Sequence, residues 1–128
     1  GFMALNCLTY GNETFKAGIS IAPVTDWRLY NTAYTERFMS TPQENDYGYE
    51  QSDLIEKAHL LKGKLLLCHG TADDNVHIQH AMLYCNALVE AGIQFEMQIY
   101  PNKNHSILGA KTRHHLYTRF NTFLKNNL

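Results

Sequence analysis

The sequence predicts an α/β fold in which about three parallel strands are joined by crossover helices. Two short apolar runs, "AGISIAPV" at residues 17–24 and "KLLLCHG" at residues 64–70, have the length and composition of strands buried on both faces. Segments with helical spacing of apolar residues stand before, between and after these runs. Alternation of helix and strand is typical of a parallel sheet, so the 128 residues fit one ordinary domain or a part of a larger one.

The first half of the chain begins with a helix over residues 2–10, which Gly11 and Asn12 would end. The strand at residues 17–24 follows and closes at a proline. Within "TDWRLYNTAYTERFMS", aromatic residues then recur every three or four positions, which predicts one or two short helices with these rings on one side. The rings are Trp27, Tyr30, Tyr34 and Phe38, of which Phe38 is expected in the core.

The second half continues the same rhythm after the strand at residues 64–70. A helix that stops at Gly92 is predicted to bury Ile78, Met82, Cys85 and Val89. The segment "FEMQIYP" alternates apolar and polar residues, which indicates one solvated face and therefore an edge strand. The last helix, residues 111–127, is predicted to face inward with Leu116, Phe120, Phe123 and Leu124.

Composition excludes some classes of protein. The hydrophobic fraction is 45% and the formal net charge is −1, which argues against disorder and against a nucleic-acid-binding charge excess. No apolar run approaches the ~18 residues of a membrane span, and no leader pattern precedes Gly1. The three cysteines lie in apolar stretches, so we expect free thiols in place of a disulfide framework.

Polar loops follow each predicted strand, at residues 23–27, 69–76 and 101–106. The carboxyl ends of parallel strands share one edge of a sheet, where function collects. Asp73 or Asp74 follows one strand and His105 follows the next, an order in which an acid can fix the tautomer of a catalytic histidine. The alternative is that the two acids only serve as charges at the start of a helix.

Four blocks carry a resemblance to a known family: "GFMALN", "APVTDWRLYNTAYTERFM", "LLLCHGTADDNVH" and "QIYPNKNHSI". Together they resemble the carboxyl-terminal part of the dipeptidyl peptidase IV family of prolyl oligopeptidase-type serine peptidases. The resemblance implies the carboxyl-terminal portion of an α/β-hydrolase, with Gly1 as the last glycine of the nucleophile elbow. The serine and the β-propeller would then lie upstream, and we expect the isolated 128 residues to be inactive.

The resemblance also implies roles for individual residues. Asp73 is expected to be the catalytic acid and His105 the base, while Asp74 would serve the loop or the following helix. A small aromatic pocket would accept the side chain of a penultimate proline, and Asn75 would offer its amide to a substrate carbonyl. The alternative for the rings is a purely structural core. The pocket positions are Val24, Trp27, Tyr30, Tyr34, Asn75 and Val76.

The resemblance implies a peptide substrate with a penultimate proline, bound by the parent enzyme. We expect no cofactor, metal or nucleic acid, and these residues carry no membrane signal. His77 and His80 have a spacing that could seat a metal, but no further ligand is placed, and His69 is expected to be structural in its loop. A bare strand edge at residues 18–22 predicts a homo-oligomer. Resemblance to bacterial relatives favours an exported or periplasmic protein. Competing interpretations are an acylaminoacyl-peptidase or esterase of the same fold, and a non-enzymatic interaction module.

Overall fold

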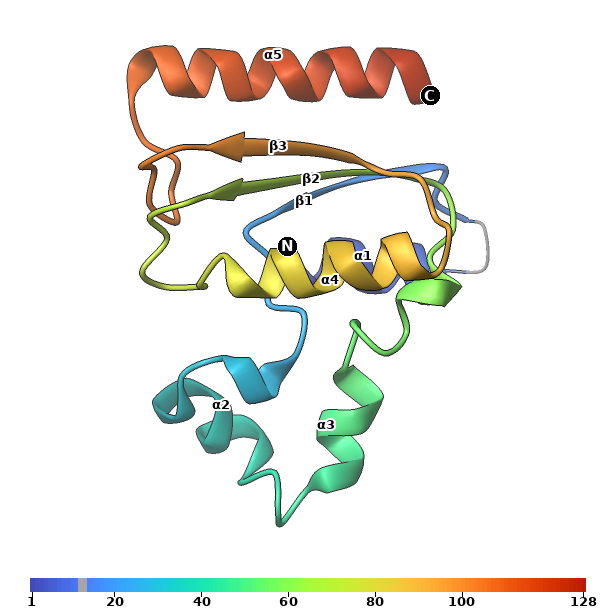
Figure 1. The fold of residues 1–128 in the computed structure, drawn as a ribbon, viewed down its shortest axis with the longest axis vertical. Helices are drawn as coiled ribbons and strands as arrows, with labels where there is room; N and C mark the ends of the chain where they lie inside the picture. Colours follow the sequence, from blue (N-terminus) through green and yellow to red (C-terminus); the bar gives the residue numbers. More distant parts are fainter. Residues whose placement is uncertain (12–13) are drawn as a thin grey trace.

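A parallel sheet with helices on both faces forms the body of the protein in the computed structural model, which describes residues 1–11 and 14–128 (Figure 1). Asn12, expected at the end of the first helix, lies outside these residues. The elements in chain order are α1 (Phe2–Tyr10), β1 (Ala17–Ile21), η1 (Trp27–Leu29), α2 (Thr32–Met39), α3 (Asp46–Ser52), η2 (Ala58–Leu60), β2 (Lys64–Gly70), α4 (Gln79–Glu90), β3 (Glu96–Tyr100) and α5 (Ala110–Asn127).

The three strands run parallel in the order β1-β2-β3, which confirms the predicted sheet. Ala17 pairs with Lys64 at the start of β1, and Gly70 pairs with Tyr100 at the end of β3. Strand β3 is an edge, as its alternating pattern predicts. Strand β1 is shorter than predicted because Ala22 turns the chain with a φ of 43°, directly before Pro23.

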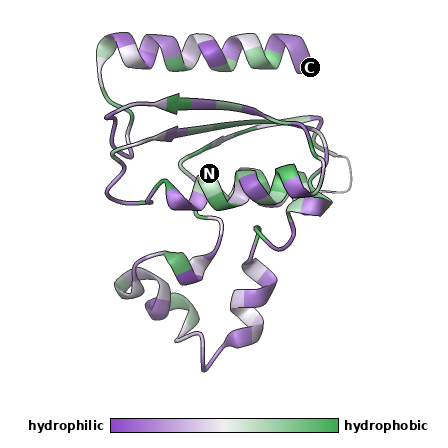
Figure 2. Ribbon diagram, in the orientation of Figure 1, coloured by the Kyte–Doolittle hydropathy of each residue, from purple (hydrophilic) through white to green (hydrophobic). Residues whose placement is uncertain are grey.

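The apolar run of β2 feeds two cores, because its successive side chains point to opposite faces of the sheet. Leu65 and Leu67 belong to the core under α1 and α4, whereas Leu66 and Cys68 belong to the core under α5. Figure 1 shows α5 on one side of the sheet and α1 with α4 on the other. In Figure 2, hydrophobic and hydrophilic residues alternate along α5, as expected for a helix with one buried side.

Some predicted core positions are wrong. On α4 the buried side chains are His80, Ala81, Tyr84 and Leu88, whereas Met82 is exposed and Val89 is 63% exposed. The prediction is therefore right only in part: Ile78 and Cys85 are partly buried, and Cys85 packs against the core. On α5, Leu116 and Phe123 are buried as predicted and Phe120 is partly buried, but Leu124 is exposed.

Residues 27–52 form a small lobe beyond the carboxyl end of β1, seen below the sheet in Figure 1. Helix α2 begins after Asn31, whose side chain accepts a hydrogen bond from the Tyr34 backbone, and it buries only Thr35. Phe38, predicted in the core, is therefore 67% exposed. The lobe leaves its aromatic side chains at a surface near the end of the sheet.

Candidate functional site

The turn after β2 places the Asp73 carboxylate below the surface and satisfies one of its oxygens with backbone groups. Asp73 is 4% exposed, and its Oδ1 accepts hydrogen bonds from the Asn75 and Val76 N–H groups, each at 2.9 Å. Asp74 is exposed and has no hydrogen-bond partner or ion pair among the residues that the structure describes. The expectation that Asp74 serves the loop is therefore wrong, because Asp73 itself closes the turn.

The second oxygen of Asp73 faces His105, which follows β3. His105 Nδ1 lies 2.8 Å from Asp73 Oδ2, in a loop that is 32 residues further along the chain. Because the carboxylate accepts, Nδ1 donates its hydrogen, and the neutral imidazole then carries a free lone pair on Nε2. The His105 side chain is 39% exposed, so this lone pair is accessible. The acid and histidine that the sequence pairs are in contact.

A second histidine contacts the same carboxylate oxygen. His69, at the penultimate position of β2, has its Nε2 3.2 Å from Asp73 Oδ2 and 2.8 Å from the Val76 carbonyl oxygen. Its side chain is fully buried, and burial lowers the pKa of His69 against the opposing effects of Val76 and Asp73. The sequence predicts His69 only as a structural residue of its loop; its spacing of four residues from Asp73 is the signal that could have placed it in the site.

The acid turn and the histidine loop are joined by backbone contacts. Ala72 N–H donates to the Lys103 carbonyl at 3.0 Å, and Asn102 N–H donates to Thr71 Oγ1 at 2.8 Å. A Cβ at Gly70 would stand 2.2 Å from the Lys103 carbonyl oxygen, so the close approach of the two segments requires glycine there. This packing holds His105 at a fixed distance from Asp73.

Three of the predicted pocket residues form one aromatic group beside the acid turn. Trp27 and Tyr34 stack with centroids 5.9 Å apart, and Tyr30 meets both rings edge-on at 5.9 and 5.5 Å. The Tyr30 hydroxyl donates to Asn75 Oδ1 at 2.5 Å. The rings are thereby tied to the turn that carries Asp73, which brings the predicted pocket and the predicted pair to the same edge of the sheet.

The remaining pocket positions are less accessible. Val24 and Val76 are buried, so their side chains offer little surface to a ligand. Phe38, which the sequence predicts in the core, instead extends the aromatic group, with its ring centroid 5.0 Å from that of Tyr34. A hollow of about 180 Å³ lies on this side and is lined by Trp27, Tyr34, Thr35, Phe38 and Met39.

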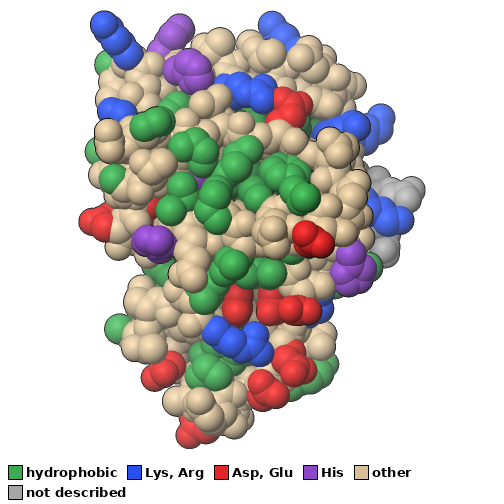
Figure 3. All heavy atoms as spheres, in the orientation of Figure 1, with side chains coloured by type: hydrophobic (Ala, Val, Ile, Leu, Met, Phe, Trp, Pro, Cys, Tyr) green, Lys and Arg blue, Asp and Glu red, His purple; other side chains and the backbone are tan. Residues whose placement is uncertain are grey.

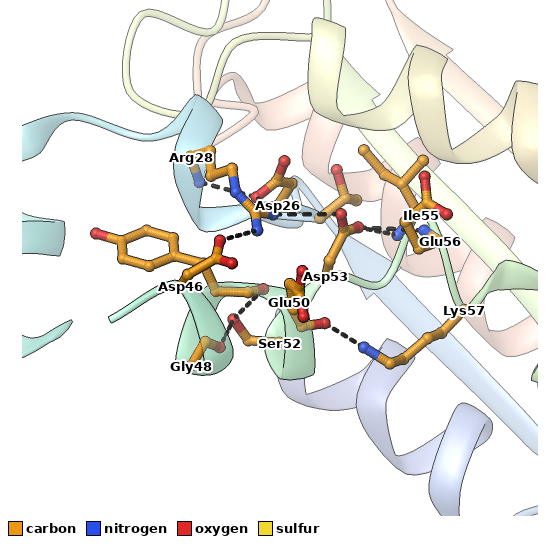
Figure 4. Close-up of polar contacts among 12 residues, drawn as sticks. Asp26, Arg28, Asp46, Gly48, Glu50, Ser52, Asp53, Ile55, Glu56 and Lys57 are labelled. Carbon is orange, nitrogen blue, oxygen red and sulfur yellow. Dashed lines mark hydrogen bonds and ion pairs between the residues drawn. The ribbon is translucent and has the colours of Figure 1, made fainter. Parts of the chain in front are cut away.

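Arg28 anchors the segment that carries Trp27 (Figure 4). Its guanidinium lies 3.5 Å from carboxylate oxygens of Asp26 and Asp53 and 3.7 Å from one of Asp46. Burial raises the pKa of Asp26, while the backbone and charge of Arg28 oppose that rise. In Figure 3, acidic side chains gather around basic ones over the lower lobe. The arginine thereby joins η1, which carries Trp27, to α3.

His80 is one of the two histidines whose spacing could seat a metal, but its Nδ1 accepts a hydrogen bond from the backbone instead. Thr25 N–H donates to His80 Nδ1 at 3.2 Å, and the Thr25 hydroxyl donates to the His80 carbonyl at 2.9 Å. His80 therefore ties α4 to the segment that leaves β1. Within residues 1–11 and 14–128, no group of three His, Cys, Asp or Glu side chains could hold a metal ion, and no helix is long and apolar enough to cross a membrane.

Comparisons with known proteins agree with this geometry. The model of the prolyl oligopeptidase family matches residues 1–128. The chain is 41% identical to a probable dipeptidyl-aminopeptidase B of Aspergillus oryzae over 98% of its length and 14% of that protein. It is 40% identical to dipeptidyl peptidase 4 of Bos taurus, over 98% of its length and 17% of the relative.

The crystal structure of Porphyromonas gingivalis dipeptidyl peptidase 4 superimposes with a TM-score of 0.97 at 56% identity, covering 99% of this chain and 18% of that one. The chain thus spans less than a fifth of the length of these relatives. Its three parallel strands and their helices match the carboxyl-terminal part of the α/β-hydrolase fold of these dipeptidyl peptidase 4-like structures. The chain belongs to the prolyl oligopeptidase family.

Proposed function

We propose that these residues are the carboxyl-terminal part of the catalytic domain of a serine-type peptidase that releases di- or tripeptides from peptide amino termini, after proline or alanine. The observation that carries the proposal is the 2.8 Å contact between His105 Nδ1 and Asp73 Oδ2 at the carboxyl edge of the sheet. It leaves Nε2 free to act as a base on a partly exposed side chain, which a buried acid orients. Relatives named as dipeptidyl peptidases support the substrate class.

In this mechanism, His105 Nε2 takes the proton of a serine hydroxyl as the oxygen attacks the peptide carbonyl. Asp73 stabilises the imidazolium, which then gives the proton to the leaving amine. An acyl-enzyme remains, and water hydrolyses it with His105 again as the base. The proposal assigns the serine, and any β-propeller, to sequence outside the 128 residues.

The position of Gly1 supports that assignment. A Cβ on Gly1 would stand 2.5 Å from both the Ile21 carbonyl oxygen and Pro23 Cα, so the chain at Gly1 lies directly against the end of β1. That end is at the edge of the sheet that carries Asp73 and His105. A nucleophile a few residues before Gly1 would start from the same edge.

The aromatic group supplies the proposed recognition of proline. Flat rings of Trp27, Tyr30 and Tyr34 can bury a pyrrolidine ring with little loss of side-chain entropy. Because the Tyr30 hydroxyl occupies Asn75 Oδ1, the amide hydrogens on Asn75 Nδ2 are left to donate to a substrate carbonyl. The pocket therefore combines an apolar surface with one oriented donor.

The test compares chromogenic anilides in the peptidase that contains this segment together with its serine. A dipeptidyl peptidase cleaves Gly-Pro-anilide, releases the intact dipeptide, and loses activity when the amino terminus is acetylated. Preference for the acetylated substrate would identify an acylaminoacyl-peptidase, and cleavage of simple esters alone would identify an esterase. Lack of turnover with all three, in a folded protein with its serine in place, would contradict the proposal and favour an interaction module.

We also propose that the 128-residue chain by itself self-associates through β1. In the part of the chain that the structure describes, β1 pairs with β2 on one side only. Unpaired strand edges associate with other chains. Sedimentation velocity over a tenfold range of concentration tests this: a dimer is expected, and replacement of Ile19 by proline should reduce association. A monomer at every concentration would contradict it.

A further inference from the structure

The buried histidine His69 shares an acceptor with the proposed catalytic base. His69 Nε2 and His105 Nδ1 both approach Asp73 Oδ2, at 3.2 and 2.8 Å. The other oxygen of Asp73 is occupied by the N–H groups of Asn75 and Val76. The carboxylate therefore accepts from three N–H groups, and His69 Nε2 makes a fourth, longer contact to the oxygen that faces His105.

The hydrogen-bond partners of His69 define its tautomer. The Val76 carbonyl, 2.8 Å from Nε2, can only accept, so Nε2 carries a hydrogen. This single hydrogen is shared between the nearer Val76 carbonyl and Asp73 Oδ2 at 3.2 Å. Nδ1 has no hydrogen-bond partner within the described part of the chain and is fully buried. Burial lowers the pKa of His69, His105 lowers it further, and Asp73 and Val76 oppose the shift. His80, on α4, is near enough to interact electrostatically with both His69 and Asp73. His69 is therefore a neutral donor from Nε2.

We propose that His69 is a positioning residue, which holds the Asp73 carboxylate in the orientation that faces His105 and limits the negative charge that His105 senses. A hydrogen bond to a carboxylate draws charge from the oxygen that accepts it. With His69 present, Asp73 stabilises a proton on His105 less than an unshared carboxylate would.

A purely structural role predicts a different outcome. His69 could act only through the Val76 carbonyl, closing the turn without affecting Asp73. Its removal would then lower stability but leave the titration of His105 unchanged. The pKa of His105 therefore distinguishes the two roles. Removal of His69 raises it if His69 is a positioning residue and leaves it unchanged if the role is structural.

The experiment measures that titration by NMR in the 128-residue chain, with His105 assigned from a His105→Gln variant. His69→Leu removes the donor and is expected to raise the pKa of His105 by about half a unit to one unit. His69→Gln supplies an amide donor in the same place and is expected to restore the pKa to within about 0.3 units. His59→Gln, at an exposed histidine, is the matched control and should change nothing.

An unchanged or lowered pKa of His105 in a folded His69→Leu variant overturns the inference. If that variant does not fold, His69→Met, which also lacks the donor, takes its place: a raised pKa of His105 supports the inference, and an unchanged or lowered pKa overturns it. In the wild-type chain, a hydrogen on His69 Nδ1, or protonation of His69 together with His105, also overturns it. The role of His69 in catalysis rests on the proposed function, but the NMR titration of His105 can be measured without enzyme activity. Failure of the peptidase assay and failure of this inference are therefore distinguishable.

Discussion

Replacement of Asp73 by asparagine is the sharpest perturbation of the proposed site, because the side chain keeps its shape and loses one acceptor. The Asn75 and Val76 N–H groups require an oxygen where Oδ1 lies. The amide must then direct its NH₂ toward His105 and His69, in place of Oδ2. His105 can meet a donor only by accepting at Nδ1, which moves its own hydrogen to Nε2 and removes the base.

The magnitude follows from that tautomer. An enzyme in which the acid of a serine triad becomes an amide, with its geometry intact, loses about 10⁴ in kcat, which corresponds to about 5.4 kcal/mol at 1.36 kcal/mol per decade. The His69 donor also loses its acceptor on Asp73 but keeps the Val76 carbonyl. We therefore expect a loss of about 1 kcal/mol in the free energy of unfolding, which leaves the variant folded.

The assay is release of the chromophore from Gly-Pro-anilide by the peptidase that carries this segment and its serine, with kcat and KM measured separately. Asp73→Asn should lower kcat by about 10⁴ and leave KM within about threefold. Asp74→Asn is the matched control and should stay within about twofold, because Asp74 is exposed and Asp73 makes the contacts of the turn. A loss of less than tenfold for Asp73→Asn, or an equal loss for Asp74→Asn, would refute the assignment of the acid.

Two further substitutions test how the site is held. Gly70→Ala places a Cβ 2.2 Å from the Lys103 carbonyl and must displace the loop before His105, so kcat should fall at least tenfold; unchanged kcat would show that the close approach does not position the base. Tyr30→Phe removes the donor to Asn75 Oδ1, and KM for Gly-Pro-anilide should rise about fivefold to tenfold with kcat nearly constant. The same substitution at the exposed Tyr47 is the control, and an equal rise there would count against an oriented amide.

The strands and the position of the site follow from local patterns in the sequence. The continuous apolar run of residues 64–70 needs two covered faces, and the structure supplies both cores. Because β2 and β3 are parallel neighbours, the loops after them must meet, so the sequence pattern could place Asp73 or Asp74 near His105. Only the resemblance to the family favoured Asp73. The inward face of α4 could not be derived in this way. Tyr84 and His80 are buried there, and only tertiary packing decides where such polar-tipped side chains lie.

The details of hydrogen bonding around Asp73 also depend on the shape of the turn. From the sequence, Asp73 was expected to orient His105 and Asp74 to serve the loop or the following helix. In the structure, both backbone donors of the turn bind Asp73. His69 joins the same carboxylate because the chain reverses between the end of β2 and Val76. Sequence spacing indicates that these residues are near one another, but only the turn shows which oxygen each donor meets.

Burial of His69 and His80 predicts how stability depends on pH. Burial lowers the pKa of both side chains, so the unfolded chain binds more protons than the folded one at pH values below about 6.5. The stability that the two neutral, buried histidines allow is fully present above that pH and is lost as the pH falls. Linkage limits the loss to about 1.4 kcal/mol per pH unit for each histidine, hence at most about 2 kcal/mol each between pH 6.5 and 5.0. The half-buried Asp26, whose pKa is raised by burial, has the opposite sign: its contribution to stability is lost as the pH rises through its folded pKa.

Urea unfolding of the 128-residue chain at pH 7.5, 6.5, 5.5 and 5.0 measures this slope. His80→Gln should reduce the slope by about half, because it removes one of the two histidines that stay neutral in the folded state. It should also lower stability at pH 7.5, since the acceptor of the Thr25 N–H is changed. His59→Gln, at an exposed position, should leave the slope as it is. A free energy of unfolding that is constant or higher at pH 5.0 would mean that the two buried rings accept protons in the folded state, and the neutral donor assigned to His69 would then be untenable.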